Sequence, residues 1–201
     1  MLENREIMMK MFPDLFHSNR VLRVDDYPTR LLQTLMSLAP KKCESSVPTV
    51  VLLTPGHLNS AYYEHTFLSD QMGIEMVEAQ DLFVENDFLY MKTVDGPKKI
   101  DVVYRRIDDD YLDPLAYNPN SVIGVPGITH VYKTGGVNIC SAPGAGIADD
   151  KAVYIYVPEM IKFYLGETPI LDNVQTWRCE RDDDLKYCLL YTSDAADEVR
   201  S

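Results

Sequence analysis

Two arginines and four aspartates lie within nine residues near the middle of the chain. They are Arg105, Arg106, Asp108, Asp109, Asp110 and Asp113. A guanidinium group binds carboxylate or phosphate through paired hydrogen bonds, and neighbouring carboxylates can bind Mg²⁺ or an ammonium group. The cluster is therefore a candidate site for charged substrates. The alternative is a set of ion pairs that only neutralise one another in a surface loop, and the residue types alone leave both open.

The residues just before this cluster predict a buried strand. Ile100, Val102, Val103 and Tyr104 are apolar, as is typical of a parallel strand covered on both faces. Residues 49–53 and 137–140 form two more short apolar runs, and helical patterns separate the three. This alternation predicts an α/β fold with a mainly parallel sheet flanked by helices. We expect residues 101–104 at its centre, between the other two strands.

The turns that follow these strands should meet at one edge of the sheet. Parallel connections return each strand in the same direction, and open α/β folds bind ligands at the carboxyl ends of their strands. We therefore expect residues 54–60, 105–110 and 141–150 to gather there, with the two arginines and several carboxylates between them.

The first of these turns leads from a strand into a helix and includes Thr54, Gly56, His57, Asn59 and Ser60. Asn59 and Ser60 are suited to cap the helix, and a helix N-terminus can bind an anion. Ordinary turns of this fold look the same, so a purely structural role is also open.

The helix after this turn carries Glu64 and His65. His57 and His65 are candidate bases. His65, however, shares a helix face with Leu68 and Met72, which is more typical of a packed side chain.

The third turn contains Gly144 and Gly146 after a strand, as in dinucleotide-binding proteins. The third glycine position is Asp149, and a carboxylate there would repel a pyrophosphate. We therefore favour a capped helix start, with Asp149 and Asp150 before a helix over residues 151–165, and Lys151 as a possible ligand contact.

The remaining pattern predicts supporting elements. Helices are expected at residues 2–11, 27–39 and 121–134, a linker at 41–48, and a hairpin pairing residues 82–84 with 89–93. We predict three parts: a helical segment to residue 46, an α/β domain over 47–187, and a tail over 188–201. The tail looks like a translated transposase sequencing adapter, as occurs at the ends of metagenomic reading frames, and should pack poorly on the core.

Composition narrows the function classes. The 201 residues carry a net charge of −12, so nucleic acid is not an expected partner. No apolar run reaches the length of a membrane span, and the N-terminal residues are too charged for a signal peptide. Cys43, Cys140, Cys179 and Cys188 are scattered and form no CxxC pair. This favours a reducing cytoplasm over a zinc site or a disulfide framework.

Several motifs together resemble the circularly permuted ATP-grasp type 2 family, which includes relatives of glutathionylspermidine synthase. They are Thr54-Pro-Gly-His-Leu-Asn59-Ser-Ala-Tyr-Tyr-Glu64-His65, Tyr104-Arg-Arg-Ile-Asp108-Asp-Asp-Tyr-Leu-Asp113-Pro, Gly124-Val-Pro-Gly127, Ala148-Asp149-Asp150-Lys151-Ala, Tyr156-Val-Pro158 and Asn173-Val-x-Thr176-Trp177. The resemblance covers about residues 1–187.

This resemblance implies an ATP- and Mg²⁺-dependent ligase that joins a carboxylate to an amine through an acyl phosphate. It also implies that this chain is the Rossmann-like domain beside the ATP clamp. The family's acidic-Asn motif and its Lys and Gly-rich ATP clamp are absent here. The metal ligands are therefore unknown, and we expect this chain alone to be inactive as a ligase and to bind Mg·ATP only weakly.

Candidate site residues follow from the matching motifs as hypotheses. For catalysis we select Arg105 or Arg106 to bind the acyl phosphate and Asp108 and Asp109 to position the amine or a water. For substrate binding we select Thr54, Asn59, Ser60, Glu64, Asp149, Asp150 and Lys151. Small carboxylate and amine substrates, and the family's other ATP-grasp subdomains, would be the partners. A non-catalytic module that binds an anion or a partner protein in a peptide-modification pathway is the alternative.

Overall fold

The computed structural model describes residues 2–198, with side-chain burial described for residues 2–190. The chain forms two compact units that divide between Pro143 and Gly144.

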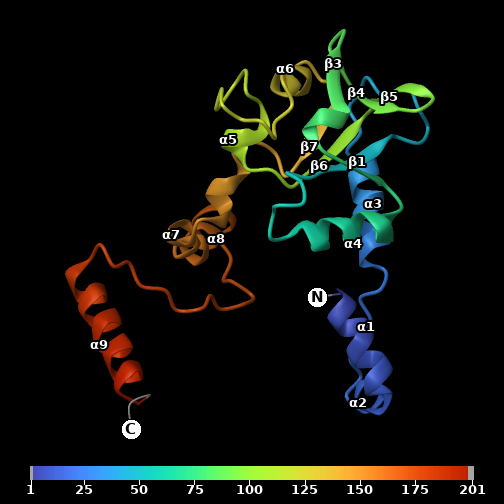
Figure 1. Ribbon diagram of the computed structural model, residues 1–201. Helices are drawn as coiled ribbons and strands as arrows, with labels where there is room; N and C mark the ends of the chain where they lie inside the picture. Colours follow the sequence, from blue (N-terminus) through green and yellow to red (C-terminus); the bar gives the residue numbers. More distant parts are fainter. Residues whose placement is uncertain (1, 199–201) are drawn as a thin grey trace. The chain divides into compact units, whose positions relative to one another are not determined.

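A parallel four-stranded sheet forms the centre of the first unit (Figure 1). Its strands are β1 (Val50–Leu53), β2 (Glu75–Val77), β6 (Val102–Arg105) and β7 (Asn138–Cys140), in the order β2-β1-β6-β7. All neighbouring strands are parallel. The predicted central strand is thus confirmed, because β6 lies between β1 and β7.

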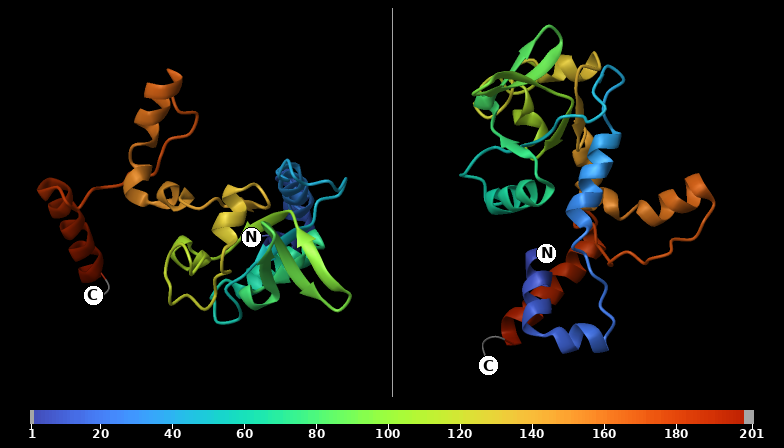
Figure 2. Two further views of the ribbon diagram at one scale, coloured as in Figure 1. Left: turned by 90° about the horizontal axis from the view of Figure 1, so that it is seen from above. Right: turned by 90° about the vertical axis from the view of Figure 1, so that its right-hand side faces the viewer.

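Two helices cover one face of this sheet (Figures 1 and 2). They are α3 (Tyr27–Ser37) and α4 (Tyr62–Met72). Leu35 of α3 and Met72 of α4 pack with Leu52 and Val102 of the strands in one buried cluster. Gly73 ends α4 in the left-handed conformation with φ of 66°, which a glycine adopts without steric cost.

The opposite face is covered by a second, antiparallel sheet and two short helices. This sheet contains β3 (Leu82–Glu85), β4 (Phe88–Thr93) and β5 (Gly96–Ile100). Helices α5 (Asp109–Leu112) and α6 (Ile128–Lys133) complete the layer. Leu89, Ile100, Leu112 and Ile128 are fully buried against Val103. The hairpin of β3 and β4 was predicted, whereas β5 was not.

The predicted helix over residues 121–134 is wrong except for its last part, α6. Residues 121–127 instead form a loop that lies tightly against α5: a Cβ on Gly124 would come within 2.1 Å of the Tyr111 carbonyl oxygen. Gly127 has a φ of 82°, and Pro126 lacks the N–H group that a helix interior needs. The two glycines therefore serve a close backbone approach and a left-handed turn.

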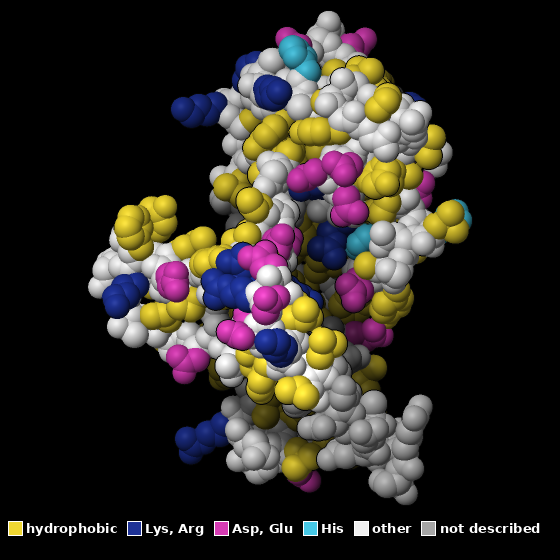
Figure 3. Space-filling model, turned by 90° about the vertical axis from the view of Figure 1, so that its left-hand side faces the viewer, with side chains coloured by type: hydrophobic (Ala, Val, Ile, Leu, Met, Phe, Trp, Pro, Cys, Tyr) yellow, Lys and Arg dark blue, Asp and Glu magenta, His cyan; other side chains and the backbone are white. Residues whose placement is uncertain are grey.

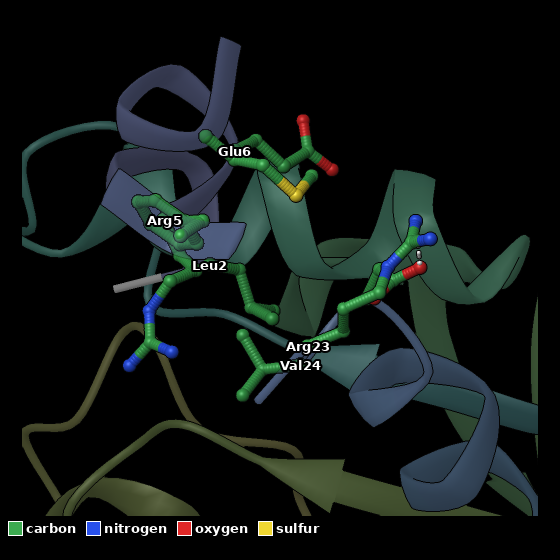
Figure 4. Close-up of a pocket in the computed structure, with 8 residues that line it drawn as sticks. Leu2, Arg5, Glu6, Arg23 and Val24 are labelled. Atoms are coloured by element: carbon green, nitrogen blue, oxygen red, sulfur yellow. Dashed lines mark hydrogen bonds and ion pairs between the residues drawn. The ribbon is translucent and has the colours of Figure 1, made fainter. Parts of the chain in front are cut away.

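At the N-terminus, α1 (Leu2–Met11) ends where the sequence predicts, and α2 (Pro13–Ser18) follows it. Neither helix contains a buried residue. A pocket of about 20 Å³ lies between α1 and the segment that holds Arg23 and Val24 (Figure 4). That is about the space of one water molecule.

The second unit consists of helices and extended chain. It contains a 3₁₀ helix (Ala145–Asp149), α7 (Lys151–Tyr154), α8 (Val157–Leu165) and α9 (Asp182–Glu198). The single helix predicted over residues 151–165 is divided in two, because Pro158 cannot donate a hydrogen bond to the carbonyl four residues earlier. Among the residues whose burial is described, every fully buried hydrophobic side chain lies at or before Ile139, so this unit has no such core.

Within the described part of the chain, no helix is both long and apolar enough to cross a membrane. Cys43 and Cys140 are free thiols. Leu189 and Leu190 of α9 are 57% and 68% exposed. The proposed adapter origin of residues 188–201 stays a prediction.

Candidate active site

The ends of three neighbouring strands place the first candidate residues together. The Thr54 amide, just after β1, donates to the Val77 carbonyl of β2 at 2.9 Å, and the Arg106 amide, just after β6, donates to the Leu53 carbonyl at 2.9 Å. The turns after β1 and β6 therefore start side by side at the carboxyl edge of the sheet, as the topology predicts.

Arg105 is buried, and backbone carbonyls occupy most of its guanidinium group. It is 8% exposed. Its Nε donates to the Ser141 carbonyl at 2.7 Å, and its Nη1 and Nη2 donate to the carbonyls of Ile107 at 2.7 Å and Ala142 at 3.3 Å. Its Nη1 also lies 2.5 Å from Asp109 Oδ1. Arg105 thus holds the turns after β6 and β7 together, and little of it is left to bind a ligand.

Arg106, the next residue, is exposed. Its guanidinium lies over the Tyr104 ring, 5.9 Å from the ring centroid. The described residues provide no hydrogen bond or ion pair to its side chain. A planar cation held by an aromatic ring but not neutralised by a carboxylate is well suited to bind an anion.

The four aspartates of the motif have different surroundings. Asp109 pairs with Arg105, whereas Asp108 and Asp110 are exposed at the start of α5. The face drawn in Figure 3 shows acidic and basic side chains next to one another. The motif therefore combines a structural ion pair with carboxylates that remain accessible to solvent and ligand.

Asp113 is 1% exposed and is a structural anchor. Its Oδ1 accepts from the amides of Leu115 at 2.9 Å and Gly127 at 3.0 Å, and its Oδ2 accepts from the Thr129 amide at 3.0 Å. Burial is the largest single effect on its pKa and would raise it, but the amide donors together lower the pKa below its usual value. The carboxylate thereby fixes both ends of the loop between α5 and α6.

Thr54 and His65 form a buried pair beneath the first turn. Thr54 Oγ1 lies 2.9 Å from His65 Nδ1 and also accepts from the Gly56 amide at 3.3 Å. Burial lowers the pKa of His65, and the nearby charge of Arg106 lowers it further, against a smaller opposite effect of Glu64. His65 is therefore a neutral, packed histidine, whereas His57 in the same turn is exposed.

Glu78, which immediately follows β2, lies at the same edge and was not selected from the sequence. A Cβ on Gly56 would come within 3.3 Å of the Glu78 carboxylate, and Gly56 has a φ of 100°. Glycine therefore allows this turn to approach the carboxylate closely. Arg106 was selected because it is a charged residue directly after a parallel strand. The same criterion applies to Glu78.

Asn59 and Ser60 are arranged differently from what the sequence predicts. The expected helix cap is wrong, because α4 begins after Ala61 without a side-chain cap. Asn59 Oδ1 instead accepts from the Ala61 amide at 2.9 Å within the turn. Glu64 lines a groove of about 590 Å³ together with residues of α1 and α3, Tyr27 among them.

Asp149, Asp150 and Lys151 belong to the second unit. The helix cap there is Asp150 rather than Asp149, since Asp150 Oδ1 accepts from the Ala152 amide at 2.6 Å. The expectation that these residues join the carboxyl edge of the sheet stays a prediction.

The described residues contain no group of three His, Cys, Asp or Glu side chains that could hold a metal ion. The carboxylates of the central motif explain why: Asp113 and Asp109 are committed to backbone amides and to Arg105. The residues present do not form a Mg²⁺ site by themselves.

Several known proteins are similar to this chain over most of its length. The chain is 52% identical over 188 residues to an uncharacterized protein of Synechocystis, which covers 94% of this chain and 39% of the relative. It is 50% identical over 183 residues to an uncharacterized protein of Mycobacterium tuberculosis, covering 91% of this chain and 33% of the relative. The chain thus spans about a third of the length of these relatives.

A Frankia alni protein provisionally named glutamate--cysteine ligase 2-3 is 36% identical over 188 residues, which is 94% of this chain and 22% of that protein. Residues 1–194 match a family described as a circularly permuted ATPgrasp. This match covers nearly all of the chain, including both units and the motifs from which the resemblance was drawn. The chain belongs to the circularly permuted ATP-grasp family.

Proposed function

We propose that this chain is part of an ATP-dependent carboxylate–amine ligase, and that Arg106 at the carboxyl edge of its parallel sheet binds the carboxylate substrate. The proposal rests on the family, on the ligase name of the Frankia relative and on one structural observation. Of two adjacent arginines, one is buried and bonded to backbone carbonyls, while the other is exposed and has no carboxylate partner among the described residues.

Arg106 is suited to the charge that develops in such a reaction. The substrate carboxylate, the acyl phosphate formed from it and the tetrahedral intermediate after amine attack are all anionic. A guanidinium group held in place before the reaction stabilises each of them without reorganisation. The backbone hydrogen bond of Arg106 to Leu53 and the contact of its guanidinium with the Tyr104 ring support that position.

Asp108 and Glu78 are the carboxylates suited to the amine. Asp108 is exposed two residues after Arg106, and Glu78 follows the neighbouring strand β2. Either can bind a substrate ammonium group by a charge-assisted hydrogen bond. His57, exposed in the turn after β1, is the better candidate for taking up the proton that the amine must lose, because His65 is already bonded to Thr54.

The remaining predicted residues are assigned to the surroundings of the substrate. Thr54, Asn59 and Ser60 would shape the turn after β1. Arg105 and Asp109 would hold the turns after β6 and β7 in place. ATP and Mg²⁺ would bind mainly to residues of the longer protein, since this chain has no cluster of three metal-ligating side chains among its described residues.

The test uses a longer protein that contains this chain, assayed for ADP release that requires both glutamate, as the first carboxylate, and an amine such as cysteine. Arg106→Ala should lower kcat/KM by about a hundredfold or more, while the matched Arg181→Ala variant, altered at an exposed arginine of the second unit, should retain it. Equal turnover by Arg106→Ala would overturn the role of this residue. Ligand binding without any ADP release would favour the non-catalytic module instead.

A further inference from the structure

A hollow lies at the amino edge of the parallel sheet, opposite the candidate active site. It has a volume of about 450 Å³, within the range of small-molecule sites. Its lining comes from the segment after α3, from the end of α6 and the turn after it, and from the start of β7. The residues are Leu38, Ala39, Pro40, Lys41, Lys42, Tyr132, Thr134, Gly135, Val137 and Asn138.

The position of this hollow separates it from the candidate active site. Asn138 is the first residue of β7, and the lysines precede β1. Arg106 and Thr54, in contrast, follow the last residues of β6 and β1. The length of a strand therefore lies between the two sites, and one small ligand cannot reach both.

The charge of the hollow is the reverse of the charge of the chain. Its lining includes Lys41 and Lys42 and no Asp or Glu, although the chain has a net charge of −12. Lys42 Nζ lies 5.9 Å from the centroid of the Phe88 ring, and Lys99 Nζ lies 4.2 Å from the same centroid. Two ammonium groups thus lie near one aromatic ring, and Lys99 has a carboxylate, Asp101, at 3.6 Å.

The walls of the hollow are fixed by bonds to the sheet. Asn138 Nδ2 donates to the Leu38 carbonyl at 2.6 Å, which ties the segment after α3 to β7. The Gly135 amide donates to the Tyr132 carbonyl at 3.1 Å and holds the tight turn that precedes β7. Leu38 and Pro40, which are at least partly exposed, contribute apolar surface next to the lysines.

We propose that this hollow is a binding site for a small organic anion, in which a phosphate or carboxylate group is joined to a flat apolar part. Lys41 and Lys42 bind the anionic group, and the wall formed by Tyr132, Pro40 and Leu38 takes up the apolar part. Because the lysines are exposed on flexible stems, binding is weaker and more sensitive to salt than at a buried arginine.

The test titrates the ¹⁵N-labelled chain with AMP, with adenosine and with inorganic phosphate, and follows backbone amide shifts by NMR. AMP should shift the amides of Lys41, Lys42, Gly135 and Asn138. Adenosine, which lacks the anion, and inorganic phosphate, which lacks the apolar part, should each bind at least about tenfold more weakly. Affinity for AMP should fall as salt rises.

The Lys41→Ala/Lys42→Ala double variant should bind AMP about tenfold more weakly than the unaltered chain. Lys133→Ala is the matched control, because Lys133 is an exposed lysine between two lining residues and does not itself line the hollow. Its affinity should stay within about twofold. An equal loss in the control, AMP shifts confined to residues 54–60 and 105–110, or no shift up to about 10 mM AMP would each overturn the proposal.

Discussion

The two edges of the parallel sheet differ in how their charged side chains are buried and paired. At the carboxyl edge, Arg105 is buried and bonded to three carbonyls and to Asp109, and both signs of charge are present. At the amino edge, Lys41 and Lys42 are exposed, and the lining of the hollow has a single sign. Burying a charge is costly unless hydrogen bonds satisfy it. The carboxyl edge is therefore preorganised in a way that the amino edge is not.

Removing Arg105 should reveal this difference most strongly. We expect Arg105→Ala to lower the free energy of unfolding by about 3–5 kcal/mol, because three carbonyls and Asp109 lose a buried partner. Lys42→Ala, at the amino edge, should change it by less than about 0.5 kcal/mol. Urea unfolding of the two variants measures both values.

Arg105→Lys sharpens this test. It keeps the charge, but an ammonium group cannot reach carbonyls on three sides, so it should restore only a minor part of the loss. If Arg105→Ala and Lys42→Ala were equally stable, the contrast between the edges would be wrong.

Asp113 provides the next largest effect, again at the carboxyl side. Replacing it by Asn leaves buried amide donors without their charged acceptor, so we expect a loss of about 2–4 kcal/mol near pH 7. The pKa of Asp113 is lowered in the folded chain. Its stabilisation is therefore present above the ordinary carboxyl pKa of 3.8 and is lost as the pH falls through the lower, folded value.

Unfolding of both proteins across acidic pH measures this dependence. The difference between Asp113→Asn and the unaltered chain should narrow as the pH falls below about 3.8. A constant difference would indicate that the lost contacts do not depend on the charge of Asp113.

Much of the fold could be predicted from the sequence, and the parts that were missed have physical causes. The order β1-β6-β7 followed from short apolar runs and from parallel topology. β5 was missed because Pro97, Lys98 and Lys99 make it polar, and as an edge strand it pairs only with β4, where proline is tolerated.

The different roles of Arg105 and Arg106 were not recognised because the two residues are chemically identical. Side chains alternate across a strand, so one of two adjacent residues at its end turns inward and the other outward. This two-residue alternation could have indicated that one arginine is buried and the other is exposed. It could not have indicated which arginine meets the carbonyls, because two of the three, those of Ser141 and Ala142, are 36 and 37 residues away. The anchoring role of Asp113 likewise depends on contacts with a loop that was predicted as a helix.

The smallest expected effect concerns His65, whose pKa lies below its ordinary value of 6.5. Between these two values the unfolded chain binds more protons, so stability should rise with pH there and be fully present above about pH 6.5. At pH 5.5 the unaltered chain should therefore be less stable through this group than at pH 7.5. His65→Asn retains a polar atom that can bond to Thr54 but does not titrate, so it should lack this part of the pH dependence.

Urea unfolding of both proteins at about pH 7.5 and 5.5 compares them, and His57→Asn, altered at an exposed histidine, is the control. Identical pH dependence in the His65 variant and the unaltered chain would mean that the imidazole is not held neutral.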